Sequence, residues 1–284
     1  MFFGIDHVLI AIPDLAASTL ALEAALGVTA AGGGVRFGSG TASSIIPLGD
    51  SFLELLAVRD PRELRSENRG RVLGAFIERG GGLAGFGLLT DDLQKAINAA
   101  WEETVPTAGP HPVALHLFNG TGVHWHTGEV GGDPWGRRMP VLVAYASEAE
   151  RAVLLPELAH PLGVTGIAGV TICTRLVFDA VDAFRRYLHV EPTALSETRG
   201  VVRFGPHEVE FLAPEVAAAE WGLDDVPEQE GLFGVTLGVA DMAKAAAWLR
   251  SAGTATREAT RGRLVLPDIE RTCNVRFRLT SAAG

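Results

Sequence analysis

Isolated carboxylates and imidazoles are the residues of this 284-residue chain whose types and spacing could do chemistry. Glu54 stands alone in an apolar run over residues 52–58. Burying a carboxylate costs on the order of several kcal/mol unless it is paired or bound to a metal. His7 precedes a second apolar run, over residues 8–12. Each has a structural alternative: an edge strand or a solvated face for Glu54, and a hydrogen bond to the backbone for His7.

A second group of imidazoles surrounds Trp125. His124 and His126 are two residues apart on an expected strand, so both side chains point to one face of the sheet. With His116 on the preceding strand, they would line the concave face of the sheet. In the alternative, the histidines face solvent and Trp125 is buried. Spacing alone does not decide the face, so both interpretations stay open.

A glycine-rich stretch over residues 131–138 contains Trp135 and Arg137. We expect a long loop at the mouth of a cavity, where these side chains would contact an aromatic or anionic ligand. The alternative is a solvated hairpin, which is the more frequent role of such loops.

Composition excludes several classes of function. The formal net charge of -10 argues against nucleic acid and anionic membranes as main partners, because both require clustered Lys and Arg. Only two cysteines occur, Cys173 and Cys273, and they indicate neither a disulfide framework nor a cysteine metal cluster. The first residues lack a basic segment followed by a long apolar core, so the expected location is the cytoplasm.

One pattern recurs four times and would position these residues: a short apolar strand, then helix-forming sequence. The copies begin at His7, Gly85, Gly169 and Gly234. In the first copy, Asp14 is the expected N-cap, and the helix over residues 15–26 should stop at Gly27. In the fourth copy, Asp241 is the expected N-cap, whereas the third copy lacks a good cap.

After each helix the hydrophobic period becomes strand-like. Two hairpins, over residues 45–58 and 201–214, align without a gap and match Glu54 with Glu210. The pattern predicts an α+β fold of four βαβββ modules that form two cupped mixed sheets. We expect two domains, residues 1–150 with the site and residues 160–284 with a structural role. Glu210 is expected on an edge strand or a solvated face, although a polar floor to its cup is an alternative.

Three connectors join the modules, over residues 59–82, 146–164 and 215–231. The first contains an expected short helix over residues 71–78. The third is rich in acidic residues and is interpreted as a surface segment.

The modules, with residues 4–8, 13–15 and 48–58 and the His160–Pro161 step, resemble the vicinal oxygen chelate superfamily and within it the glyoxalase-like domain proteins. The resemblance implies the glyoxalase/bleomycin-resistance/dioxygenase-like fold. It also implies a cavity inside each cupped sheet, where members of the superfamily bind or convert small molecules.

The resemblance further implies a divalent metal (Zn, Fe, Mn, Co or Ni) and no nucleotide. His7 and Glu54 occupy the ligand positions, with Glu54 also the expected catalytic residue. His124 or His126 would complete the site, while His116, Trp125, Trp135 and Arg137 would contact the substrate. The partner modules depart from the pattern, with glycines 85, 169 and 234 at the position of His7.

Two functions follow from the resemblance. The first is a metal-dependent lyase, isomerase or dioxygenase that acts on a small oxygenated molecule. The alternative is a non-catalytic protein of the same fold that binds a drug or natural product. A homodimer is compatible with either function.

Overall fold

The computed structural model describes residues 1–64, 68–132, 138–228 and 230–282. Within them, no helix is both long and apolar enough to cross a membrane. The elements of the first half are β1 (Phe2–Ala11), α1 (Leu15–Leu26), β2 (Gly32–Arg36), β3 (Thr41–Leu48), β4 (Ser51–Val58), α2 (Pro61–Leu64), α3 (Asn68–Glu78), β5 (Gly82–Thr90), α4 (Leu93–Glu102), β6 (Thr107–Leu117), β7 (Gly122–Val130), β8 (Val141–Tyr145) and α5 (Glu148–Ala152).

The strands of the first half form a closed barrel in the order β1-β4-β3-β2-β6-β7-β8-β5. The ring closes on one side where β5 pairs antiparallel with β1, and on the other where β2 pairs with β6. One face of each strand lines the barrel lumen, because side chains alternate along a strand. Phe52, Trp125 and Val143 form an apolar cluster in this lumen. The expected cup is therefore a barrel filled by side chains.

The second half repeats the order of elements without closing the ring. Its elements are β9 (Val164–Cys173), α6 (Val177–Leu188), β10 (Pro192–Leu195), β11 (Arg199–Phe204), β12 (His207–Leu212), α7 (Pro214–Glu220), β13 (Gly231–Val239), α8 (Met242–Ser251), β14 (Arg257–Glu258), β15 (Leu264–Leu266) and β16 (Arg276–Ser281), with short 3-10 turns at Thr260–Gly262 and Glu270–Thr272. The strand order is β10-β11-β12-β9-β13-β16-β15-β14, so β10 and β14 are the sheet edges. The second half is an open cup.

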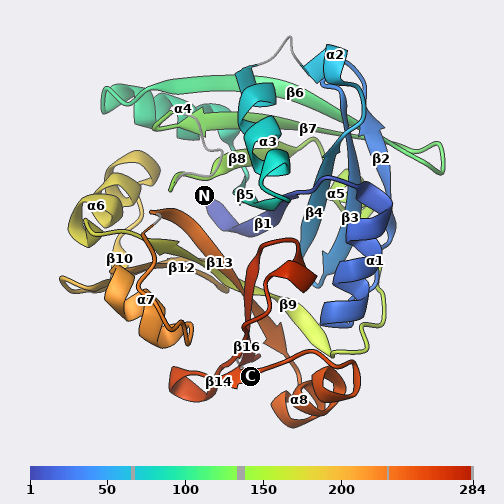
Figure 1. Ribbon diagram of the computed structural model, residues 1–284. Coiled ribbons are helices and arrows are strands. Elements are labelled where there is room, and N and C mark those ends of the chain that lie inside the picture. Colours follow the sequence, from blue (N-terminus) through green and yellow to red (C-terminus); the bar gives the residue numbers. More distant parts are fainter. Residues whose placement is uncertain (65–67, 133–137, 229, 283–284) are drawn as a thin grey trace.

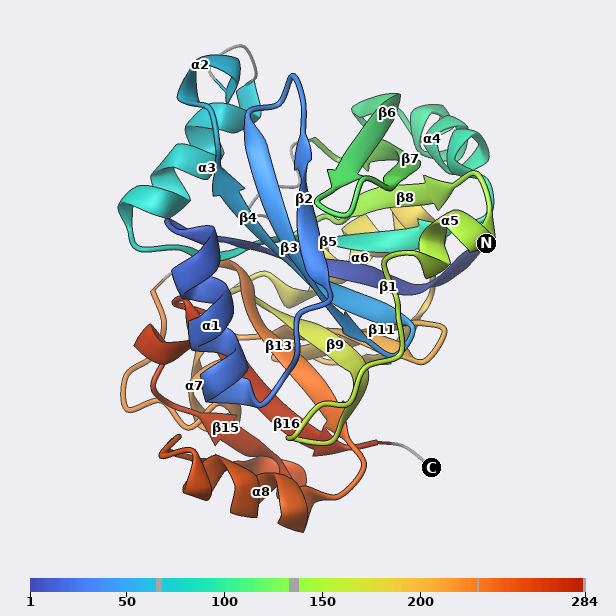
Figure 2. The ribbon, with the colours of Figure 1, turned by 90° about the vertical axis from the view of Figure 1, so that its right-hand side faces the viewer.

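The two halves pack back to back, with the barrel above the open sheet in Figure 1 and the same stacking in Figure 2. β1 lies against β11, β5 against β13, and β3 and β4 against β9. A single apolar cluster runs through both halves, from Val8 and Leu53 on the barrel to Val170 and Val235 on the sheet. Each sheet therefore has one face in a shared core and one face toward its own lumen.

Two matching hairpin turns interlock the halves. Gly49, between β3 and β4, has a φ of 65°, and Gly205, between β11 and β12, has a φ of 55°. A Cβ at Gly49 would collide with the carbonyl oxygen of Thr165 on β9, and one at Gly205 with that of Phe3 on β1. Each turn thus needs glycine for its left-handed backbone and for its close approach to the first strand of the other half.

The residue two positions after each of these glycines accepts a hydrogen bond across the junction. The Ile5 N–H donates to His207 Nδ1 at 3.2 Å, and the Ile167 N–H donates to Ser51 Oγ at 3.4 Å. The junction therefore has approximate internal two-fold symmetry, with a titratable imidazole on one side and a hydroxyl on the other.

The expected fold class and much of the element pattern are confirmed. Helix α1 spans Leu15–Leu26, with Asp14 accepting from the Ala17 N–H at 2.8 Å and Gly27 ending the helix in the left-handed conformation. Asp241 caps α8, and α6 lacks a side-chain cap, as expected.

The interpretation of residues 215–231 as an acidic surface segment was wrong for its first part. Helix α7 forms there, and Ala217, Glu220 and Trp221 are buried. Apolar side chains at 216–219 and 221 direct the helix into the second cup, and arginines there neutralise Glu220.

Candidate functional site

A β-bulge in β1 brings two titratable side chains together. The pairing of β1 with β5 shifts register between Ile5 and His7, which interrupts the alternation of side chains. His7 Nδ1 and Asp6 Oδ2, although on adjacent residues, share a hydrogen bond of 2.9 Å. Both side chains are buried. The bulge thus forms an Asp–His pair at one end of the barrel lumen.

The imidazole of His7 is held by packing. Its ring stacks on Phe52 of β4 with a centroid distance of 5.1 Å, because His7 and Phe52 are partners in the parallel β1–β4 pairing. On the β5 side, a Cβ at Gly87 would lie 2.7 Å from His7 Cε1. Glycine at this position therefore makes room for the imidazole.

Asp6 also joins the lumen to α5. The Tyr145 hydroxyl donates to Asp6 Oδ2 at 3.0 Å, and Arg151 Nε donates to Asp6 Oδ1 at 3.1 Å. Arg151 Nη2 also donates to the backbone carbonyl of Asp50 in the β3–β4 turn. Burial, and next the negative charge of Asp6, raise the pKa of Tyr145 well above its ordinary value, so the phenol stays protonated at neutral pH.

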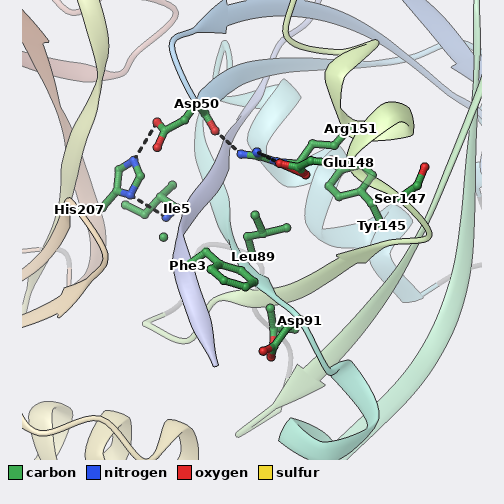
Figure 3. A pocket seen from close by; sticks show the side chains of 12 residues that line it. Phe3, Ile5, Asp50, Leu89, Asp91, Tyr145, Ser147, Glu148, Arg151 and His207 are labelled. Atoms are coloured by element: carbon green, nitrogen blue, oxygen red, sulfur yellow. Dashed lines mark hydrogen bonds and ion pairs between the residues drawn. The ribbon is translucent and has the colours of Figure 1, made fainter.

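Across the junction, His207 of β12 faces Asp50 (Figure 3). Because His207 Nδ1 accepts the Ile5 N–H, the proton of a neutral ring lies on Nε2, which is 3.5 Å from Asp50 Oδ1. The hydrogen bond from His207 is the largest effect on the pKa of Asp50 and, outweighing partial burial, lowers it below 3.8. Asp50 is therefore a stable carboxylate at the rim of the junction.

Asp50, Tyr145, Arg151 and His207 border a cavity of about 350 Å³ beside the junction of the two halves, where His207 is the contribution of the second half to the lining. Such a volume is at the lower end of the range for small-molecule sites, roughly 300–1,000 Å³. The lining residues are Phe3, Gly4, Ile5, Asp50, Leu89, Thr90, Asp91, Tyr145, Ser147, Glu148, Arg151 and His207. In Figure 3 the apolar side chains of Phe3 and Leu89 lie next to each other, with Asp50 and Arg151 above them and Asp91 below them.

Glu54 lies deeper in the same barrel and is already neutralised. Its carboxylate accepts from Ser43 Oγ and forms an ion pair with Arg36 Nη2. Arg36 Nη1 donates to Ser43 Oγ at 3.0 Å, and the guanidinium lies 5.3 Å from the Trp125 ring centroid. The edge-strand or solvated-face alternative for Glu54 is wrong, because only 2% of the residue is exposed. A buried ion pair satisfies this carboxylate.

The other predicted site residues are divided between two faces. Trp125 is buried in the lumen, whereas His116, His124 and His126 are exposed on the outer face of the barrel. His124 Nδ1 lies 3.3 Å from Glu150, and His116 packs against Phe37. The structure does not bring these three histidines together with His7 and Glu54, because alternation along β6 and β7 points them to the face opposite Leu115 and Trp125. Trp135 and Arg137 lie outside the described residues.

The described residues do not fit a metal at the positions implied by the resemblance. They contain no group of three or more His, Cys, Asp or Glu side chains placed to hold an ion. The positive charge of Arg36 also lies beside the Glu54 carboxylate, where it opposes the approach of a divalent cation. Catalytic metal sites usually have about three protein ligands.

Several residues of this site were not anticipated from the sequence: Asp6, Arg36, Tyr145, Arg151 and His207. Asp6 precedes His7, and strand alternation would have placed it on the opposite face, so only the bulge reveals it. His207 lies in the second half, and its role depends on the junction. The sequence signal that could have indicated His207 is the alignment of the two hairpins, which matches residue 207 with Ser51.

Comparison with known proteins assigns the chain to a family. The family model described as a glyoxalase-like domain matches residues 5–188, which is more than half of the chain. The chain therefore belongs to the glyoxalase-like domain family, and the resemblance to the glyoxalase-like domain proteins is confirmed. No curated protein matches the sequence.

Solved structures support the fold. A hypothetical protein from Staphylococcus aureus superposes with a TM-score of 0.71 at 12% identity, covering 98% of this chain and 99% of that one. A mutant of 4-hydroxymandelate synthase from Streptomyces coelicolor has a TM-score of 0.66 at 14% identity, covering 100% and 94%. A xylose isomerase-like TIM barrel/4-hydroxyphenylpyruvate dioxygenase fusion protein has a TM-score of 0.58 at 12% identity, covering 100% of this chain and 50% of that one. Identities this low show a shared fold alone.

Proposed function

We propose that this protein binds a small amphipathic molecule, cationic or neutral, in the cavity beside the junction of its two halves, without a resident metal. The observation that supports the proposal is the lining of the cavity. Three carboxylates, Asp50, Asp91 and Glu148, line it beside Arg151. Arg151 is already paired with the buried Asp6. Arg151 also lies 3.5 Å from Glu148, and the N-terminal amino group is paired with Asp91. Four carboxylates thus face two cations, so the net charge left for a ligand is negative.

The apolar wall determines the other half of the ligand. Phe3 is 49% exposed, which is unusual for a phenylalanine at the start of a buried strand, and Leu89 lies beside it. An aromatic or aliphatic group would cover this surface, and a cation would be attracted by the ring face of Phe3 and by the carboxylates. The ligand would be held between an apolar wall and an acidic rim.

The test uses three probes that share one ring and differ in charge: benzylamine, benzyl alcohol and benzoate. Saturation-transfer NMR of the full-length protein should rank their affinities in that order. Glu148→Gln should weaken benzylamine about two- to fivefold, as expected for an ion pair with a side chain that is 83% exposed. Glu102→Gln, which removes an exposed carboxylate of α4 outside the cavity, is the matched control. Preference for benzoate, or equal loss in both variants, would contradict the proposal.

The metal-dependent lyase, isomerase or dioxygenase remains the second candidate, and one observation favours it. A histidine that binds a metal through one ring nitrogen commonly donates a hydrogen bond from its other ring N–H to a carboxylate. His7 Nδ1 shares such a hydrogen bond with Asp6. Metal analysis of protein purified without a nickel column separates the two candidates. Our proposal expects sub-stoichiometric metal and benzylamine binding that withstands a chelator. A full equivalent of metal that is lost in His7→Ala would favour the enzyme.

A further inference from the structure

The lumen of the second cup contains a buried arginine where the first barrel has apolar side chains. Arg278 on β16 pairs in register with Thr236 on β13, and Glu210 on β12 pairs with Thr171 on β9. Arg278 Nε donates to Thr236 Oγ1 at 2.8 Å, and Nη2 donates to Glu210 Oε2 at 2.6 Å. Only 3% of the Arg278 side chain is exposed. The expectation that Glu210 faces solvent or an edge was therefore wrong, and its cup has a polar floor.

Positive charge exceeds negative charge in this lumen. Helix α7 contributes a second carboxylate, Glu220, which pairs with Arg199 and lies 3.5 Å from Arg263 Nη1. Arg199 also pairs with Glu210. Three mostly buried guanidinium groups thus face two carboxylates. The partly exposed Arg261, 3.9 Å from Glu220, adds to the excess. A buried excess charge is unfavourable unless a counterion is present.

Four buried N–H donors on the lumen side have no hydrogen-bond acceptor among the described residues: Arg278 Nη1, Arg263 Nη1, Trp221 Nε1 and Arg276 Nε. Arg278 Nη1 and Arg263 Nη1 lie 3.7 and 3.5 Å from Glu220 Oε2, and Arg263 Nη1 lies 3.8 Å from Glu210 Oε1, all without hydrogen-bond geometry. The Arg278 guanidinium lies 4.6 Å from the Trp221 ring centroid. Buried donors are almost always paired in native proteins, so this group requires an acceptor.

The titration of these arginines agrees with a missing acceptor. Burial first, and the neighbouring charge of Arg263 next, lower the pKa of Arg278 to about 9. Burial also lowers the pKa of Arg263. A bound anion would oppose both effects by favouring the charged forms of the guanidinium groups.

We propose that the lumen of the second cup is a separate binding site for a small carboxylate, which accepts hydrogen bonds from Arg263, Arg278 and Trp221. Planar guanidinium groups match the two oxygens of a carboxylate better than they match a spherical ion. The indole N–H adds a third donor. The second half, expected to be only structural, would then have a ligand of its own, opposite in charge to that of the cavity beside the junction.

The test measures trifluoroacetate binding to the full-length protein by 19F relaxation at constant ionic strength. Binding should saturate. Arg263→Gln should weaken it about tenfold, as for a lost hydrogen bond to a charged group. Trp221→Phe, which removes the indole N–H and keeps a ring, should weaken it several-fold. Arg185→Gln is the control, because Arg185 is 46% exposed and pairs with Asp182 on α6, which packs on the other face of the sheet. Glu148→Gln, in the other cavity, should leave binding unchanged.

Competition with other anions and the NMR signal of Trp221 test whether the bound ion is a carboxylate in this lumen. Acetate should displace trifluoroacetate at lower concentration than chloride does, and the reverse order would overturn the carboxylate assignment. If Arg263→Gln fails to fold, the test uses the unmodified protein. A carboxylate that accepts from the Trp221 indole N–H should shift the resonance of that N–H during the titration. Absence of saturable binding, an unmoved indole resonance, or unchanged affinity in Trp221→Phe would overturn the proposal.

Discussion

The ion pair of Arg36 with Glu54 shows how one side chain determines the role of another. A glutamate alone in an apolar strand is compatible with a metal ligand, a catalytic group or a solvated face. The guanidinium from β2 satisfies the carboxylate inside the barrel, and Ser43 adds a hydrogen bond. The role of Glu54 is therefore decided by a residue 18 positions away in sequence, which no local pattern around Glu54 contains.

Breaking this pair should be costly. Arg36→Met leaves the Glu54 carboxylate buried without its cation and should lower the free energy of unfolding by about 3–5 kcal/mol. Adding Glu54→Gln should recover most of that loss, because the uncompensated charge is removed. Urea denaturation of the two single variants and the double variant measures the coupling. Arg203→Met, in an exposed pair, should cost about 1 kcal/mol or less. Additive losses in the Arg36 and Glu54 variants would contradict the pairing.

Asp50 should make stability depend on pH at the junction. Its pKa in the folded protein lies below the ordinary value of 3.8, chiefly because His207 donates to it. The stabilisation is therefore complete above about pH 4 and is lost as the pH falls through the lower folded value. The difference in urea midpoint between the unmodified protein and Asp50→Asn should therefore be nearly constant above about pH 5 and should shrink as the pH falls below about 4. In a His207→Gln background this pH dependence should largely disappear. A difference that grows on acidification would refute the assignment.

The hairpin turns are the elements that join the halves. The β3–β4 and β11–β12 turns occupy matching positions, and each rests on the first strand of the other half through a glycine that faces a backbone carbonyl. The strands that follow these turns begin with Ser51 and His207, which accept backbone N–H groups of β9 and β1. Because one turn carries Asp50 and the strand after the other carries His207, the elements that interlock the halves also form one wall of the cavity.

Alanine substitution of these glycines should separate backbone strain from close approach. Gly205→Ala introduces both, because a Cβ would collide with the Phe3 carbonyl oxygen. Gly38→Ala introduces strain alone, since Gly38 has a φ of 81° and open space around it. We expect Gly38→Ala to cost about 1 kcal/mol and Gly205→Ala about 1–3 kcal/mol more. Thermal unfolding measures the loss of stability in both variants. Equal losses would show that the β11–β12 turn moves away from Phe3 at little cost.

At the scale of the whole molecule, the halves share one core. The outer face of the barrel contributes Val8 and Leu53, and the open sheet contributes Val170 and Val235, to a single apolar cluster. A lone barrel would expose this face to water. The two lumens, in contrast, are separate: the first contains one buried Arg–Glu pair, and the second an excess of arginine. The two halves therefore share apolar residues on the faces that pack together but differ in the charged residues of their lumens.

A chain ending at residue 150 should therefore fail to fold on its own. Loss of the second half leaves the outer faces of β1, β4 and β5 uncovered, which removes most of the shared core. Circular dichroism and NMR should show no cooperative unfolding and no dispersed spectrum. A cooperative transition in the truncated chain would instead establish an independent first half. Mixing residues 1–150 with 151–284 should restore folding if the lost core is the cause.

Local patterns were sufficient for the elements and the repeat. Capping by Asp14 and Asp241, the stop at Gly27 and the aligned hairpins all depend on neighbours close in sequence, so the sequence by itself determined the α+β class and the four modules. Only the tertiary structure decided the lumens. The bulge that brings Asp6 beside His7, the pairing of Arg36 with Glu54, the outward direction of His124 and His126, and the burial of α7 all depend on register and on distant partners. A one-residue shift along a strand reverses which face a side chain occupies, and sequence spacing does not specify that shift.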